Sequence, residues 1–221
     1  MTSNDNKKYT ILQNDYLDIK HPSTRKTVRV YRVLSIVEFE NPHCGIVPIY
    51  TTGGYIESEK NLSYTDSSWV MNTSKVFDDA RVELNTLVKE QAAVFESANV
   101  KNSIISGYSR VHGRSAVTDS IVSGKVNVNG FVNIKSSTIE NGSMISEGAK
   151  LNRCIVSDGC FIHGDAVAEK CVFSDTVELL GGISLINCTA NGRYVGKDGK
   201  FMNSHLGVDL ELNVTTGKSD V

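Results

Sequence analysis

The chain repeats a 17-residue unit from residue 101 to residue 185. Five units align without gaps: KNSIISGYSRVHGRSAV, TDSIVSGKVNVNGFVNI, KSSTIENGSMISEGAKL, NRCIVSDGCFIHGDAVA and EKCVFSDTVELLGGISL. Each unit carries three apolar anchors, nearly all of them aliphatic, which in the first unit are Ile105, Val111 and Val117. A unit this short can bury its apolar side chains only against its neighbours, so the period predicts a solenoid of about 7–8 coils of 17–18 residues.

The repeat divides the chain into three regions. Residues 1–65 lack it and contain the Val-, Ile- and Tyr-rich stretch KTVRVYRVLSIVEFE, which predicts a small β cap over the first coil. Residues 66–202 form the predicted parallel β-helix, because valines recur every six residues upstream of the aligned units as well. Residues 203–221 are expected to form a terminal strand and a loose tail.

Composition excludes several classes of partner. The net charge of -2 offers no positive field for a nucleic-acid backbone. The polar start MTSNDNKKYT predicts neither a signal peptide nor a membrane-spanning helix. The five cysteines form no CxxC pair, which favours reduced thiols in a cytoplasmic protein.

Side chains alternate along a strand, so the residue two before each anchor also points inward and the residue between them points outward. At the first anchor this rule gives an inner column of small side chains: Ser103, Ser120, Ser137, Cys154, Cys171 and Cys188. Stacked strands lie about 4.8 Å apart, so the three cysteines are expected to form a ladder of small core side chains. A metal site needs ligands that converge on one point, and a ladder does not converge, so no metal is predicted.

The outward column beside the same anchor is unusually apolar. Its members are Trp69, Leu87, Ile104, Ile121, Thr138, Ile155, Val172 and Thr189, and we call this column the stripe. An exposed apolar stripe would mark a contact between subunits. Two alternatives remain open at this point: β-branched residues favour strands even in solvent, and the N-terminal unit could fold back over this face.

The aliphatic-then-small rhythm of hexads such as VFDDAR, VFESAN and IHGDAV resembles the hexapeptide-repeat family over residues 76–185. That resemblance implies an all-β, left-handed parallel β-helix and a homotrimer packed side by side. The segment GGYIESEKNLSYTDSSWVMNTSKVFDDARV is similar to the opening of the YdcK-like proteins of bacteria and phages, whose acyltransferase label rests mostly on fold and implies little about chemistry.

The resemblance also implies a candidate catalytic histidine, because acyltransferases of this family commonly use one as a general base beside acyl-CoA. Two candidates, His112 and His163, occupy the same corner three coils apart, about 14 Å from one another. This corner lies opposite the stripe, so a trimer built on the stripe would turn both histidines away from the cleft between subunits.

Three functions therefore stay open. The first is an acyltransferase-like homotrimer, catalytic or degenerate, that binds acyl-CoA between its subunits. The second is a non-enzymatic, phage-like trimer that binds a small ligand or a host protein. The third is a structural spacer, for which the repeat itself would suffice.

Overall fold

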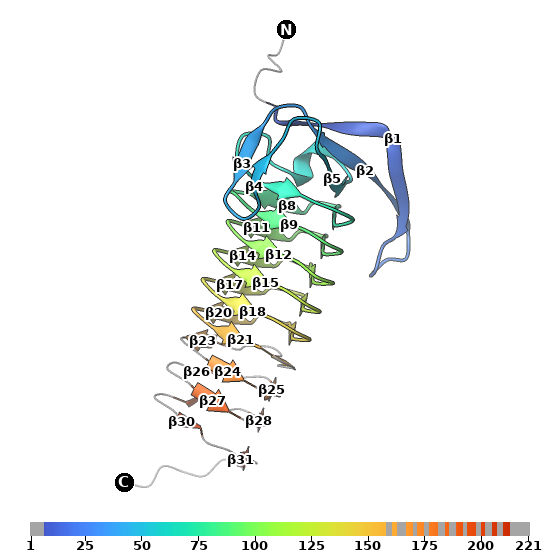
Figure 1. Cartoon of the computed structure of the whole chain (residues 1–221). Coiled ribbons are helices and arrows are strands. Elements are labelled where there is room, and N and C mark those ends of the chain that lie inside the picture. Colours follow the sequence, from blue (N-terminus) through green and yellow to red (C-terminus); the bar gives the residue numbers. More distant parts are fainter. Residues whose placement is uncertain are drawn as a thin grey trace, which may run out of the picture.

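The computed structural model describes residues 7–157 in full, and beyond residue 157 it describes only the backbone of the strands. A stack of short coils forms a column, and a β cap sits at its N-terminal end (Figure 1). Within the described part of the chain, the only helical segment is the single turn η1 (Glu59–Asn61). The chain is thus nearly all β, as the repeat predicts.

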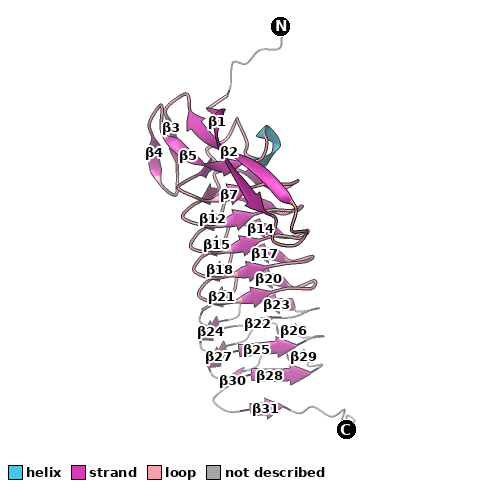
Figure 2. Cartoon of the chain, turned by 90° about the vertical axis from the view of Figure 1, so that its right-hand side faces the viewer, coloured by secondary structure: helices cyan, strands magenta, loops and turns pink. Residues whose placement is uncertain are grey.

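The column has three faces, and each is a parallel sheet of strands taken from successive coils (Figure 2). The first face carries β6 (Trp69–Val70), β9 (Leu87–Val88), β12 (Ile104–Ile105), β15 (Ile121–Val122), β18 (Thr138–Ile139), β21 (Ile155–Val156), β24 (Val172–Ser174), β27 (Thr189–Asn191) and β30 (His205–Leu206). The second carries β7 (Lys75–Val76), β10 (Ala93–Val94), β13 (Arg110–Val111), β16 (Asn127–Val128), β19 (Met144–Ile145), β22 (Phe161–Ile162), β25 (Val177–Leu180), β28 (Tyr194–Lys197) and β31 (Leu210–Leu212). The third carries β8 (Arg81–Glu83), β11 (Asn99–Lys101), β14 (Ala116–Thr118), β17 (Asn133–Lys135), β20 (Lys150–Asn152), β23 (Val167–Glu169), β26 (Ser184–Leu185) and β29 (Lys200–Phe201).

The register of the faces follows the sequence period. Ile104 pairs with Ile121 on the first face, and the anchors Ile105 and Val122 pair beside them. Both anchors are fully buried, because an anchor points into the column while its neighbour points out. These features make the molecule the parallel β-helix that the period predicts, in accordance with the left-handed form that the resemblance implies.

The inner column beside the first anchors is a ladder of hydrogen bonds. The hydroxyl of Ser103 accepts the backbone N–H of Ser120 at 3.0 Å, and the Ser120 hydroxyl accepts the N–H of Ser137 at 3.1 Å. The Ser137 hydroxyl accepts the N–H of Cys154 at 3.0 Å. Cys154 is buried in this column, as predicted, whereas Cys171 and Cys188 lie outside the described residues. Small hydroxyls suit the column because they satisfy backbone groups that the interior hides from water.

The corner that joins the first face to the second, which we call the first corner, has a left-handed backbone in every fully described coil, with glycine at 107 and 124 and with Asn72, Glu90 and Asn141 in the others. Gly107 has φ of +71°, and a Cβ added to it would lie 2.4 Å from the carbonyl oxygen of Gly124 in the next coil. At Gly107 the close approach of the next coil, together with the left-handed backbone, disfavours any side chain.

The cap joins two faces of the column in different ways: one part extends the second face, and the other covers the start of the first face. Strands β5 (Thr52–Ile56), β2 (Thr27–Ser35) and β1 (Tyr9–Lys20) continue the second face, with β5 parallel to β7 and the β1–β2 pair antiparallel. The small hairpin of β3 (Phe39–Asn41) and β4 (Gly45–Val47) instead lies over the start of the first face, where the Asn41 side chain donates to the Ser67 carbonyl. The long β1–β2 hairpin descends beside the upper coils (Figure 1).

Candidate functional site

An aromatic stack lines the second corner, which joins the second face to the third. Phe77, Phe95 and His112 each follow an anchor of the second face, so the period places them one above another. The rings of Phe77 and Phe95 stack with centroids 5.0 Å apart, and those of Phe95 and His112 with centroids 4.5 Å apart. The candidate His112 is therefore the end of a stack that begins under the cap.

Both ring nitrogens of His112 face oxygen atoms. Its Nε2 lies 3.0 Å from Oδ1 of Asn127, and its Nδ1 lies 3.5 Å from Oε2 of Glu96. The side chain is only 13% exposed. A general base must present a free lone pair to the proton that it removes. In this geometry neither nitrogen is open to a substrate, because Nε2 is paired with the Asn127 side chain and Nδ1 is buried beside Glu96 without a hydrogen-bond partner.

Glu96 ties this corner to the cap. One of its carboxylate oxygens accepts the Ser23 hydroxyl at 2.7 Å, and the other accepts the Gly113 N–H at 2.8 Å. Burial acts to raise the pKa of Glu96, but these two hydrogen bonds and the nearby His112 outweigh it, so the pKa lies below the ordinary value of the group. Glu96 is thus held as a carboxylate that fastens the hairpin turn to the solenoid.

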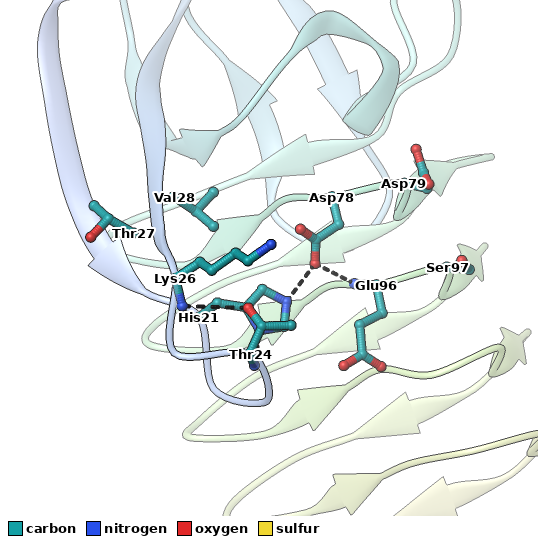
Figure 3. Close-up of a pocket in the computed structure, with 9 residues that line it drawn as sticks. All are labelled: His21, Thr24, Lys26, Thr27, Val28, Asp78, Asp79, Glu96 and Ser97. Carbon is teal, nitrogen blue, oxygen red and sulfur yellow. Dashed lines mark hydrogen bonds and ion pairs between the residues drawn. The ribbon is translucent and has the colours of Figure 1, made fainter.

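His21, at the end of β1, makes the second fastening (Figure 3). Its Nδ1 accepts the N–H groups of Ser23 and Thr24, both at 3.1 Å. That leaves the proton on Nε2, which donates to Oδ2 of Asp78 at 2.8 Å. The ring is 4% exposed and stands edge-on to Phe77 and Phe95. His21 therefore joins the cap to the helix and keeps no nitrogen free for a substrate.

A hollow of about 390 Å³ opens between the hairpin turn and the second corner. Figure 3 shows Lys26 extending over it towards Asp78, with Asp79 and Glu96 on the solenoid side. Asp79 forms an ion pair with Lys60 at 2.7 Å. The carboxylates of this hollow thus already have donors from the protein, which makes it a joint between cap and helix.

A second hollow, of about 440 Å³, lies along the first corner. We call it the glycine groove, and its walls come from Gly107, Tyr108, Gly124, Lys125, Asn141 and Gly142. Tyr108 is 58% exposed and forms one wall. Because the first corner directly follows the strands of the first face, the groove borders the stripe.

The structure confirms the direction of the stripe but corrects the exposure of its first two members. Trp69, Leu87 and Ile104 are register partners on the first face, as expected of one column. Yet Trp69 is fully buried and Leu87 is 1% exposed, so the expectation that they lie open to a partner is wrong. The physical reason is the β3–β4 hairpin, whose Phe39 packs edge-on against Trp69 at 5.4 Å. The alternative in which the N-terminal unit covers this face holds for these two coils.

Below the hairpin the stripe is open. Ile121 is 38% exposed and Ile155 is 52% exposed, with Ile104 and Thr138 partly exposed beside them. Val172 continues the register, but only its backbone is described. His163, the other catalytic candidate, lies outside the described residues.

Several of these residues escaped the sequence analysis. Nothing in the sequence pairs His21 with Asp78, which are 57 positions apart and belong to the cap and the solenoid. The carboxylates of the second corner had a readable signal, since Asp78 and Glu96 each stand two residues after an anchor in successive coils. The glycine groove was also readable in part, because Gly107 and Gly124 recur at the period.

In the fully described residues 7–157, no group of three or more His, Cys, Asp or Glu side chains converges as metal ligands would. No helix in the described part of the chain has the length and hydropathy that crossing a membrane requires.

Comparison with known families gives one match. Residues 74–151 match the family described as GlmU-like, C-terminal hexapeptide. No curated protein matches the chain. The matched segment covers the coils from β7 to β20, whose anchors, corners and register are those described above. Sequence pattern and three-faced solenoid thus agree, and the chain is a hexapeptide-repeat β-helix protein.

Proposed function

We propose that this member of the acyltransferase-like superfamily works as a homotrimer, joined along the open part of the stripe, that binds a small-molecule ligand between its subunits. The repeat family and the solenoid fold support the superfamily. The trimer and the ligand are the proposal, and the observation that carries them is the exposure of Ile121 and Ile155 on an otherwise regular face.

The stripe suits a contact between copies for a physical reason. Its open members are β-branched side chains from four consecutive coils, held in register by a parallel sheet: Ile104, Ile121, Thr138 and Ile155. A contiguous row of this kind is costly to leave in water and has little freedom to rearrange. A second copy that presents the same row would bury it.

Binding is better supported than acyl transfer by the described residues. His112 stacks on Phe95, its Nε2 is paired with the Asn127 side chain and its Nδ1 is buried, so neither ring nitrogen is accessible to an acceptor amine or hydroxyl. A degenerate acyltransferase that still binds acyl-CoA fits this arrangement, as does a non-enzymatic binding module.

The oligomer is tested by the double variant Ile121→Asp with Ile155→Asp. Each change places a carboxylate in the proposed contact, where it would be desolvated without a partner. We expect light scattering to show a mass of three chains of 24.1 kDa for the wild type and one chain for the variant. Met144→Asp, an outward apolar residue of the second face in the coil between them, should leave the trimer intact. A wild-type monomer, or a trimeric double variant, would overturn the assignment of the stripe.

The ligand is tested by thermal unfolding of the trimer with acetyl-CoA. A ligand at 100 times its Kd stabilises the folded state by about 2.7 kcal/mol. We expect stabilisation that is equal in the wild type and in His112→Asn, without release of free CoA when an amine acceptor is added. Release of CoA that His163→Asn abolishes would establish catalysis instead, and the absence of any stabilisation would remove acyl-CoA as the ligand.

A further inference from the structure

We propose that the glycine groove is a binding site for a small, flat aromatic anion, an aryl carboxylate or an aryl phosphate. The site is built from residues of a single chain, so it does not depend on the trimer. Three features carry the inference: the shape of the groove, the rigid aromatic wall that bounds it, and a cation without a carboxylate partner.

The shape comes from three residues of one outward column. Tyr108, Lys125 and Gly142 stand 17 positions apart, so they occupy the same place in three successive coils. A Cβ added at Gly142 would have nothing within 4 Å, which means that the missing side chain leaves open space below Lys125. With about 4.8 Å per coil, the column from Tyr108 to Gly142 spans about 10 Å. That length and a volume of about 440 Å³ accommodate a fused pair of aromatic rings.

The wall is held in place before any ligand arrives. The Tyr108 hydroxyl accepts a hydrogen bond from Nε2 of Gln91, one coil above, at 3.1 Å. Tyr108 also follows Gly107, whose N–H donates to Oε2 of Glu90 at 2.6 Å. An aromatic side chain whose backbone is anchored and whose hydroxyl is hydrogen-bonded loses less conformational freedom on binding than a free one, and it offers a flat apolar surface.

The charge selects an anion. Lys125 is exposed, and no carboxylate lies within 4.0 Å of its Nζ among the residues described in full. The carboxylates along this corner are engaged elsewhere: Glu90 accepts from Gly107, and Glu140 accepts from the Ser123 hydroxyl. The hollow at the second corner is the reverse case, because Asp78, Asp79 and Glu96 would repel an anion there. An apolar groove with one free ammonium group is complementary to an aromatic body that carries one negative group.

The test is calorimetric titration of the full-length chain with 2-naphthoate, 2-naphthyl phosphate and the neutral 2-naphthalenemethanol. We expect one site per chain for the two anions, with affinity at least ten-fold above that for the neutral compound. The tighter of the two anions identifies the group, carboxylate or phosphate, that Lys125 holds. Lys125→Gln and Tyr108→Ala should each weaken binding of the anions at least ten-fold.

The second corner offers a matched control. Arg114 lies over the ring of Phe131 at 5.3 Å, so it too combines an exposed aromatic ring with a cation from the neighbouring coil. Arg114→Gln and Phe131→Ala should leave the affinity unchanged. Equal binding of the neutral compound, or an equal loss in the control variants, would overturn the site.

Discussion

The same outward column behaves in opposite ways at its two ends. In the first two coils Trp69 and Leu87 are buried, whereas Ile121 and Ile155 further along are exposed. All four occupy equivalent positions of the repeat and point away from the coil axis. The difference lies in what covers them, because the β3–β4 hairpin reaches the first two coils and ends there. Position in a repeat therefore sets the direction of a side chain, and only long-range packing sets its exposure.

The largest expected effect tests the covered end. Trp69→Ala should lower the free energy of unfolding by about 3–5 kcal/mol, because it empties a fully buried space between Phe39 and the first coils. The corresponding change at the open end, Ile155→Ala, should cost about 0.5 kcal/mol or less when it is measured in an Ile121→Asp background that light scattering shows to be monomeric. Urea denaturation of both variants measures the contrast. Equal losses at the two ends would show that the hairpin does not distinguish them.

A second prediction concerns how the cap is fastened above the covered end. Lys8 is 5% exposed, and its Nζ lies 3.5 Å from Oδ1 of Asp66 in the segment before β6. Burial lowers the pKa of Lys8 to about 8, and the attraction of Asp66 opposes that shift only in part. The unfolded chain, with a lysine pKa of 10.5, thus binds the proton more tightly than the folded chain does.

The contribution of Lys8 to the free energy of unfolding must then rise with pH across this window. Between pH 8 and pH 10.5 the unfolded state holds the Lys8 proton and the folded state does not, so the contribution of Lys8 to the free energy of unfolding increases by about 3 kcal/mol. Below pH 8 and above pH 10.5 the contribution is level. Lys8→Met should remove this rise from denaturation curves recorded across the window, and Lys26→Met, in the exposed turn of the hairpin, should retain it. A rise of equal size in Lys8→Met would assign the effect to other groups.

The sequence predicted the contacts that each coil makes with the next coil, and it did not predict the contacts between the cap and the solenoid. The 17-residue period alone predicts the three faces, their register, the inner columns and the direction of the stripe. It does so because each coil contacts mainly the equivalent residues of the coils above and below it. The buried column that includes Ser120 and Cys154 is an example, and it is found where the period places it. The contacts of His21 with Asp78 and of Phe39 with Trp69 join the non-repeating cap to the solenoid, and no period relates these pairs. The candidate site was therefore predicted only where it lies on the repeat.

The last prediction concerns the inner column, where the effect of the repeat can be measured without the effect of the cap. The cap covers the outer surface of the first coils and should not affect their interior. Ser68 lies under the cap, and its hydroxyl accepts the N–H of Thr86 at 3.2 Å. Ser120 lies in an open coil, and its hydroxyl accepts the N–H of Ser137 at 3.1 Å. Changing either to alanine leaves a buried N–H without its side-chain acceptor, at a cost of about 1–3 kcal/mol. Since both acceptors lie inside the coil, we expect Ser68→Ala and Ser120→Ala to differ by less than about 0.5 kcal/mol in urea denaturation.

Ser120→Cys, which copies the residue found at Cys154, should cost less than Ser120→Ala because sulfur retains a weak acceptor in the same space. If Ser68→Ala alone were costly, the cap would control the interior as well as the surface, and the contrast between the two ends of the stripe would extend through the coil.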